Sequence, residues 1–118
     1  MIYIQWGKIY PTKFENIVKL EKFDPSYRAG LYVIMAHKGN GENGISSFRV
    51  LYFGQSKNLS ERGFPKNHTS YDCWVSQAEG CPLYVATHLM PNSTKENREK
   101  LEYSLINDYN LVCNKKKG

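Results

Sequence analysis

Four side chains of this sequence are of types that can act on a phosphodiester bond. Tyr32 and Tyr52 lie inside two apolar runs, GLYVIMAH and SFRVLYFG, and Arg62 and Glu102 follow later in the chain. Hydrolysis of such a bond needs an activated water, stabilisation of a charged transition state and help for the leaving oxygen. A glutamate is an oxygen ligand suited to one Mg²⁺ or Mn²⁺ ion. An arginine offers a permanent charge and a forked set of donors for phosphate.

The two apolar runs must position the tyrosines. Both are rich in β-branched and aromatic residues, which is typical of strands. Between them, residues 38–46 carry three glycines and two asparagines, and these residue types tolerate the positive φ angles of turns. The sequence therefore predicts a β-hairpin with a long turn.

The pairing of this hairpin decides where the tyrosines lie. If His37 pairs with Ser47, Tyr32 lies directly opposite Tyr52 on one face of the sheet. A shift of one residue would place them on opposite faces. A facing aromatic pair is also a favourable packing contact, so pairing alone leaves both a structural and a chemical interpretation open.

The rest of the chain predicts a mixed arrangement of helices and strands. Thr12 with Glu15, and Ser93 with Glu96, have the spacing of capping boxes at helix N-termini. No element can be assigned over 64–80. The predicted elements are a strand over 2–6, a helix over 13–22, the hairpin, a short helix over 56–63, a strand over 83–90 and a final helix from Ser93. The expected fold class is α/β of the α+β type, a small layer with a three-stranded antiparallel sheet flanked by helices.

Composition limits the class of protein. The chain has 118 residues and a net charge of +5, which fits one domain with a preference for polyanionic partners. No apolar run is long enough for a membrane helix, and the N-terminus does not resemble a signal peptide, so a cytoplasmic location without membrane contact is expected.

The chain has three cysteines, Cys73, Cys81 and Cys113, and this odd number predicts free thiols. Their spacing with His68 matches no common zinc pattern.

Local interactions offer simpler explanations for two of the candidates. Arg98 and Glu102 have the i, i+4 spacing of an ion pair on a helix surface. Arg62 at a helix end would complement the helix dipole. Tyr71 and Trp74 are available for stacking with nucleic-acid bases, and the alternative is an ordinary solvated face.

Taken together, the ordered elements resemble the motifs of the GIY-YIG nuclease family. The resemblance rests on GLY at 30–32, YFG at 52–54, the run GQSKNLSERG that ends near Arg62, and LEYSLINDYNLVCN, which contains Glu102 and Asn114. It covers a core over 30–114 of a single domain over 1–118, and leaves 1–29 as an N-terminal strand and helix extension. The interval between the tripeptides is about twice the usual length for the family, and the excess falls in the glycine-rich turn.

The resemblance implies a role for each matching residue. Tyr32, Tyr52, Arg62 and Glu102 would be catalytic: Tyr32 would take a proton from the attacking water, Tyr52 would orient the phosphate or the water, and Glu102 would bind one metal ion. Asn114 would be structural. The residues expected to bind substrate are Gly54, Lys57, Asn58 and His68.

The function that the resemblance implies is metal-dependent endonuclease activity on DNA with a single Mg²⁺ or Mn²⁺ ion. The alternative is a nucleic-acid-binding module of the same fold that lacks catalysis. Family members usually obtain specificity from an attached recognition domain. A single domain of this type is therefore expected to have weak sequence specificity, to prefer a structured or single-stranded substrate, or to form a homodimer.

Overall fold

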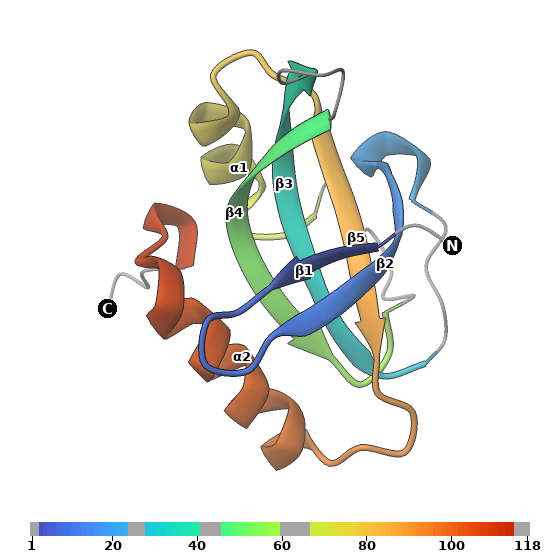
Figure 1. Cartoon of the computed structure of the whole chain (residues 1–118). Helices are drawn as coiled ribbons and strands as arrows, with labels where there is room; N and C mark the ends of the chain where they lie inside the picture. The colour runs from blue at the N-terminus through green and yellow to red at the C-terminus, as the bar shows by residue number, and fades with distance from the viewer. Residues whose placement is uncertain (1–2, 24–27, 41–45, 60–66, 115–118) are drawn as a thin grey trace.

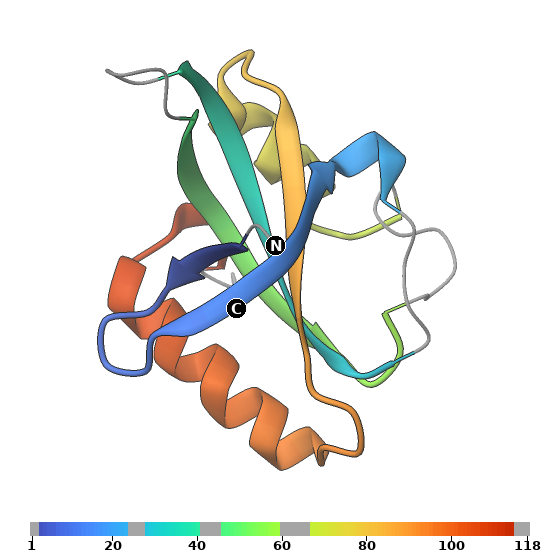
Figure 2. The same ribbon diagram turned by 45° about the vertical axis from the view of Figure 1, so that its right-hand side comes forward.

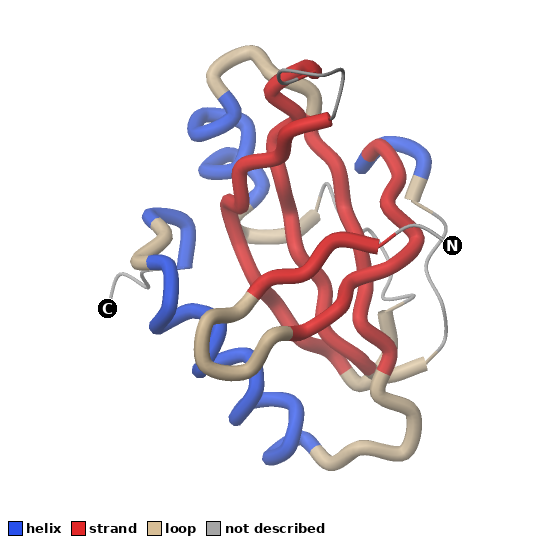
Figure 3. Tube along the Cα trace, in the orientation of Figure 1, coloured by secondary structure: helices blue, strands red, loops and turns tan. Residues whose placement is uncertain are grey.

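The computed structural model describes residues 3–23, 28–40, 46–59 and 67–114. It contains an antiparallel five-stranded sheet with strand order β1-β2-β5-β3-β4. Figure 1 shows this sheet with its helices, and Figure 3 distinguishes the element types. The strands are β1 Tyr3–Trp6, β2 Thr12–Lys19, β3 Gly30–Asn40, β4 Ser46–Ser56 and β5 Leu83–Leu89. The helices are α1 Tyr71–Ala78 and α2 Lys95–Tyr109, with short 3₁₀ helices at Leu20–Lys22 and Val112–Asn114.

The mixed α+β class was predicted correctly, but the sheet is larger than the three strands expected. The two additional strands are β1 and β2, which Figure 2 shows crossing in front of the long strands. β1 corresponds to the short N-terminal strand that the sequence indicated. The third predicted strand, over 83–90, agrees with β5.

The predicted helix over 13–22 is wrong. Residues 12–19 form β2, and only Leu20–Lys22 are helical, as a single 3₁₀ turn. Thr12 donates its hydroxyl hydrogen to the carbonyl of Tyr10 instead of capping a helix. Asn16 has a φ of 59°, where the pairing with β5 shifts register, and this bulge breaks the strand alternation that sequence patterns detect. Pairing with β1 and β5 therefore overrides a local helical pattern.

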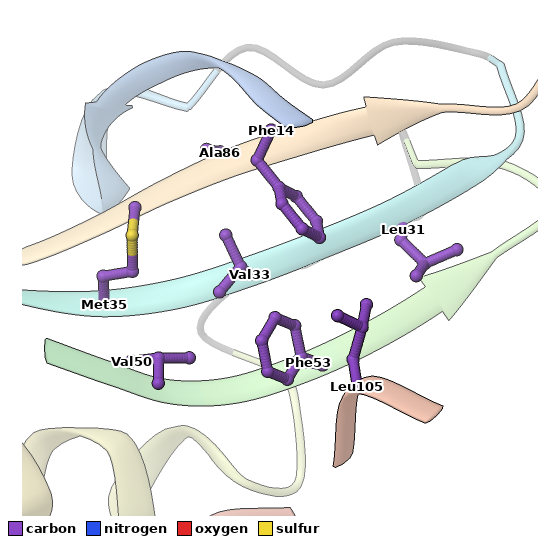
Figure 4. Packing of buried hydrophobic residues seen from close by; sticks show 8 residues of the cluster. All are labelled: Phe14, Leu31, Val33, Met35, Val50, Phe53, Ala86 and Leu105. Carbon is purple, nitrogen blue, oxygen red and sulfur yellow. The ribbon is translucent and has the colours of Figure 1, made fainter. Parts of the chain in front are cut away.

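Two hydrophobic clusters cover the two faces of the sheet. β3 lies between β5 and β4 in the sheet, and a cluster packs on each of its faces, so its buried side chains alternate between the two clusters. The first cluster packs against α2 through Leu105, and Figure 4 shows it as Phe14, Leu31, Val33, Met35, Val50, Phe53, Ala86 and Leu105. The second cluster includes Trp74 of α1 together with Tyr32 and Ile34.

The C-terminal helix agrees with the prediction apart from its first residue. The N-cap is Thr94, whose side-chain oxygen accepts from the backbone N–H of Asn97 at 3.0 Å. The capping box had placed the start at Ser93. α1 fills part of the segment that the sequence left unassigned. Among the described residues, no helix is both long and apolar enough to cross a membrane.

Candidate active site

A pocket of about 170 Å³ lies at β4, the strand at one edge of the sheet. It is formed by side chains from β3, β4, the segment after β4, the segment before α1 and helix α2. Its lining residues are Tyr32, Tyr52, Gly54, Gln55, Ser56, Asn58, Leu59, His68 and Glu102. Six of the residues singled out in the sequence thus meet in one place, although the first and last of them lie far apart in the chain.

The two tyrosines share a face, but they are not direct partners. Tyr32 pairs with Gly54, and Tyr52 pairs with Ile34, so the predicted register is displaced by two residues at this point. A displacement of two preserves the face, because strand side chains alternate with period two. The ring centroids of Tyr32 and Tyr52 lie 6.1 Å apart, with the planes tilted by 31°. The pairing shifts again between Ile34 and Met35, where β4 accommodates an extra residue.

Gly54 makes room for the first tyrosine. A Cβ atom built on Gly54 would overlap the phenol ring and hydroxyl of Tyr32. The glycine is therefore required for the Tyr32 side chain to cross over β4 and reach the pocket. The resemblance implies that Gly54 binds substrate, whereas the close neighbour observed at Gly54 is the side chain of Tyr32.

His68 is oriented by the backbone that precedes α1. Its Nδ1 accepts a hydrogen bond from the N–H of Ser70 at 2.9 Å, so the ring proton lies on Nε2. Nε2 lies 3.4 Å from the hydroxyl oxygen of Tyr52. The imidazole also packs against Trp74, with ring centroids 4.7 Å apart. His68 thus donates toward Tyr52 and leaves the Tyr52 hydroxyl hydrogen available for another acceptor.

Glu102 brings a partly buried carboxyl group to the same pocket. Burial raises the pKa of Glu102 to about 7, and the negative charge of Glu99 on the same helix contributes to the shift. Burial also raises the pKa of Tyr52, and Glu102 adds to that effect, while side-chain hydrogen bonds with Tyr32 and Ser70 oppose it. Tyr52 therefore retains its proton at neutral pH.

The ion pair between Arg98 and Glu102 that the spacing suggested is not observed in the described part of the chain. Arg98 is only 4% exposed and turns to Gln55 and Ser93 instead. The salt bridge observed on α2 joins Lys95 and Glu99. Glu102 is therefore left facing the pocket rather than paired along its helix.

Asn114 lies behind the pocket wall. Its Oδ1 accepts from the backbone N–H of Phe53 at 2.9 Å, and its Nδ2 donates to the carbonyl of Phe53 at 2.9 Å. Phe53 lies between Tyr52 and Gly54, so this amide fixes the stretch of β4 that carries both. Asn114 thus connects the chain end to the backbone of β4.

The segment after YFG does not begin as the predicted helix. β4 continues to Ser56, and the Ser56 hydroxyl bonds the backbone of Asn58 in a tight turn. Asn58 lines the pocket and Lys57 is exposed beside it. Arg62 lies outside the described residues.

The cysteines differ from the expectation of free thiols. Cys73 of α1 and Cys113 of the last 3₁₀ helix form a disulfide, and only Cys81 is free. Both partners belong to or pack against the second hydrophobic cluster, where α1 meets the chain end. An odd count was a poor guide, because pairing depends on proximity in the fold rather than on parity.

Some participants were not found from the sequence. Gln55, Ser56 and Leu59 line the pocket without having been singled out, although each lies close to the YFG tripeptide. Trp74, considered for base stacking, is fully buried and instead supports His68 and Tyr52. Its place within an unassigned segment gave no pattern that could have revealed this role.

The donor set for a metal ion is small. Within the described residues, no three His, Cys, Asp or Glu side chains are grouped so as to hold an ion. The single carboxylate of Glu102 suits a Mg²⁺ or Mn²⁺ ion that keeps most of its water ligands. The raised pKa of Glu102 fits this use, since a nearby cation would compensate the negative charge that burial disfavours.

Comparisons with family models, with curated proteins and with solved structures find no match in any of the three.

Proposed function

We propose that this protein is a GIY-YIG-type endonuclease that hydrolyses phosphodiester bonds in DNA with one Mg²⁺ or Mn²⁺ ion. The observation that carries the proposal is the convergence of Tyr32, Tyr52, His68 and Glu102 on one pocket. Packing alone does not require a carboxyl group from α2 beside two tyrosines from β3 and β4. Their order along the chain is also that of the motifs which the sequence resembles.

In the proposed reaction, Glu102 would hold the metal ion. When bound, such an ion would supply positive charge to stabilise the charged transition state and the leaving oxygen. Among the described residues, Glu102 is the carboxylate that lines the pocket, and a single carboxylate is too few ligands for two ions, which is why a one-ion mechanism is proposed.

The proposal also includes the cytoplasm as location, although the Cys73–Cys113 disulfide weighs against it, because such bonds are rare in reducing compartments.

The two tyrosines have different roles in this proposal. Tyr32 takes the proton from the attacking water as a phenolate, after its own hydroxyl proton has passed to solvent, and a nearby cation would favour this ionised form. Tyr52 keeps its own proton, because burial and Glu102 raise its pKa, and donates that hydrogen to the phosphate or the water. His68 donates to the Tyr52 oxygen and so fixes the direction of this hydroxyl. Arg62 would bind the phosphate, a role that rests on its position in the motif alone.

Nuclease activity is tested with purified protein on plasmid and on single-stranded DNA, with Mg²⁺, Mn²⁺ or EDTA. Glu102→Ala should lower the cleavage rate by about a hundredfold or more, because it removes the ion and its charge. Arg62→Ala should have an effect of similar size. Glu96→Ala is the matched control, since Glu96 is an exposed glutamate on the same helix and this variant should cleave like wild type.

Each alternative has its own outcome in this assay. Binding of DNA without cleavage by the wild type would favour the binding module over the enzyme. Cleavage that persists in EDTA would contradict the metal ion. Equal rates for Glu102→Ala and Glu96→Ala would contradict the assignment of the site.

A further inference from the structure

Arg98 and Gln55 form a polar pair immediately behind the proposed pocket. Arg98 lies on α2, one helical turn before Glu102, and only 4% of its surface is exposed. Its Nε donates to Oε1 of Gln55 at 2.9 Å. Figure 1 shows α2 running beside β4, the strand that carries Gln55. The contact therefore joins the helix of the proposed metal ligand to the strand that carries Tyr52 and Gly54.

The remaining bonds of Arg98 fix the guanidinium. Its Nη1 donates to the backbone carbonyl of Ser93 at 2.9 Å and to the Ser93 hydroxyl at 3.1 Å. All three acceptors are neutral, and within the described residues no carboxylate forms a salt bridge with Arg98. A buried cation without a counter-ion is costly, and arginine keeps its charge at physiological pH. The pair thus leaves uncompensated positive charge beside the pocket.

The hydrogen bond from Arg98 determines which end of the Gln55 amide is free. Oε1 must face Arg98, because a guanidinium has donors only. The two N–H groups of Nε2 are left to donate elsewhere, and no hydrogen bond from Nε2 is found within the part of the chain that the structure describes. Gln55 also lines the pocket. The residue therefore offers amide donors, backed by a buried cation, to an occupant with acceptor oxygens.

We propose that Gln55 binds a non-bridging phosphate oxygen of the substrate through its side-chain N–H groups, and that Arg98 is the positioning residue that holds it. This inference rests on the proposed function, since it assigns a phosphate ligand within the same site. It extends that function by giving the buried Arg98 a part in substrate binding. The phosphate supplies the negative charge that Arg98 lacks.

The substitution Gln55→Glu separates this role from a structural one. The introduced carboxylate would retain an oxygen for Arg98 and gain an ion pair, so the melting temperature should stay at or above that of wild type. The substitution replaces the donors that face the pocket by a negative charge. Binding of a fluorescent oligonucleotide in EDTA, measured by anisotropy, should weaken by about tenfold or more. Gln5→Glu is the matched control, since it makes the same charge change at an exposed position of β1.

Arg98→Lys tests the positioning role. A lysine keeps the charge but cannot bond Gln55 and Ser93 with a planar fork, so affinity should fall several-fold. Equal affinities for Gln55→Glu and Gln5→Glu, in a wild type that binds and cleaves DNA, would overturn the inference and leave the proposed function intact. Unchanged affinity in Arg98→Lys would overturn the role of Arg98. A wild type that neither binds nor cleaves any nucleic acid would overturn both proposals.

Discussion

At the scale of single residues, the burial of Glu102 opposes the ionisation of its carboxyl group. Its carboxyl group is partly buried, and Glu99 adds repulsion, so its pKa rises to about 7. Ionisation of Glu102, which the proposed reaction needs, therefore lowers the free energy of unfolding. Perturbed carboxyl groups in pockets are frequent at functional sites, where stability is often lower than the sequence could provide.

Replacing Glu102 with Gln should stabilise the protein in a pH-dependent way. Below about pH 4.5 the carboxyl group is protonated in folded and unfolded chains, so variant and wild type should be similar. Between pH 4.5 and about 7 the unfolded chain ionises first, and wild-type stability should fall relative to the variant. Above pH 7 the gain should level off on the order of 1 kcal/mol, a value reduced for solvent screening. Urea unfolding across this range measures the difference.

The same variant should be inactive, which separates stability from function. Glu96→Gln, on the exposed part of α2, is the control and should show little dependence on pH. A Glu102→Gln variant that is less stable than wild type at pH 8 would contradict the assignment of an uncompensated charge.

At the scale of elements, the pocket wall depends on the attachment of α1 and of the chain end. The disulfide joins Cys73 of α1 to Cys113, and the neighbouring Asn114 bonds the backbone of Phe53 in β4. Trp74, next to Cys73, packs against Tyr52 and His68. The attachment of two short elements therefore positions side chains that they do not themselves carry.

Loss of the disulfide should destabilise the protein strongly. It closes a loop with a sequence separation of 40, for which chain entropy predicts about 4 kcal/mol. Cys73→Ser should lose about this much unfolding free energy in denaturant titrations, whereas Cys81→Ser, at the free cysteine, should lose little. Adding a reductant should bring wild type down to the level of Cys73→Ser. A wild type that is insensitive to reductant would show that the bond is absent.

At the scale of the whole molecule, the N-terminal hairpin and the end of α2 lie against each other. The N–H of Gly7, in the turn between β1 and β2, donates to the hydroxyl of Tyr109 at 2.8 Å. The N–H of Lys8 donates to Asp108 at 2.8 Å, and the rings of Trp6 and Tyr109 pack edge to face. These two distant parts of the chain thus both pack against the first hydrophobic cluster.

Tyr109→Phe tests the contact between the N-terminal hairpin and α2 by removing one oxygen atom. It leaves the ring in place but removes the acceptor of the Gly7 N–H, so unfolding free energy should fall by about 1 kcal/mol. Tyr103→Phe is the matched control on the same helix, since Tyr103 is 68% exposed, and it should be neutral. Thermal and urea unfolding of both variants provide the measurement. Equal stability of the two variants would show that the contact contributes nothing.

Patterns along the chain predicted the elements whose hydrophobic signal is strong. β3, β4, β5 and α2 were predicted near their observed positions, because their apolar runs or stripes are long and their partners are local or simple to infer. β2 was mistaken for a helix, because a bulge at Asn16 interrupts its alternation and its partners β1 and β5 were not known. The register of the central hairpin was displaced because its long turn does not fix pairing.

The order of amino acids alone establishes which side chains are present and that Tyr32 and Tyr52 lie in neighbouring strands. The observed register, with its extra residue in β4, decided that they share a face. It could not place Glu102 against them, because that depends on how α2 packs along β4. Burial raises the pKa of Glu102 only in the folded chain. The hydrogen bond from Arg98 to Gln55 likewise forms only there. Residue type and strand period are local properties of a sequence, whereas distance, burial and charge compensation arise from contacts between distant segments.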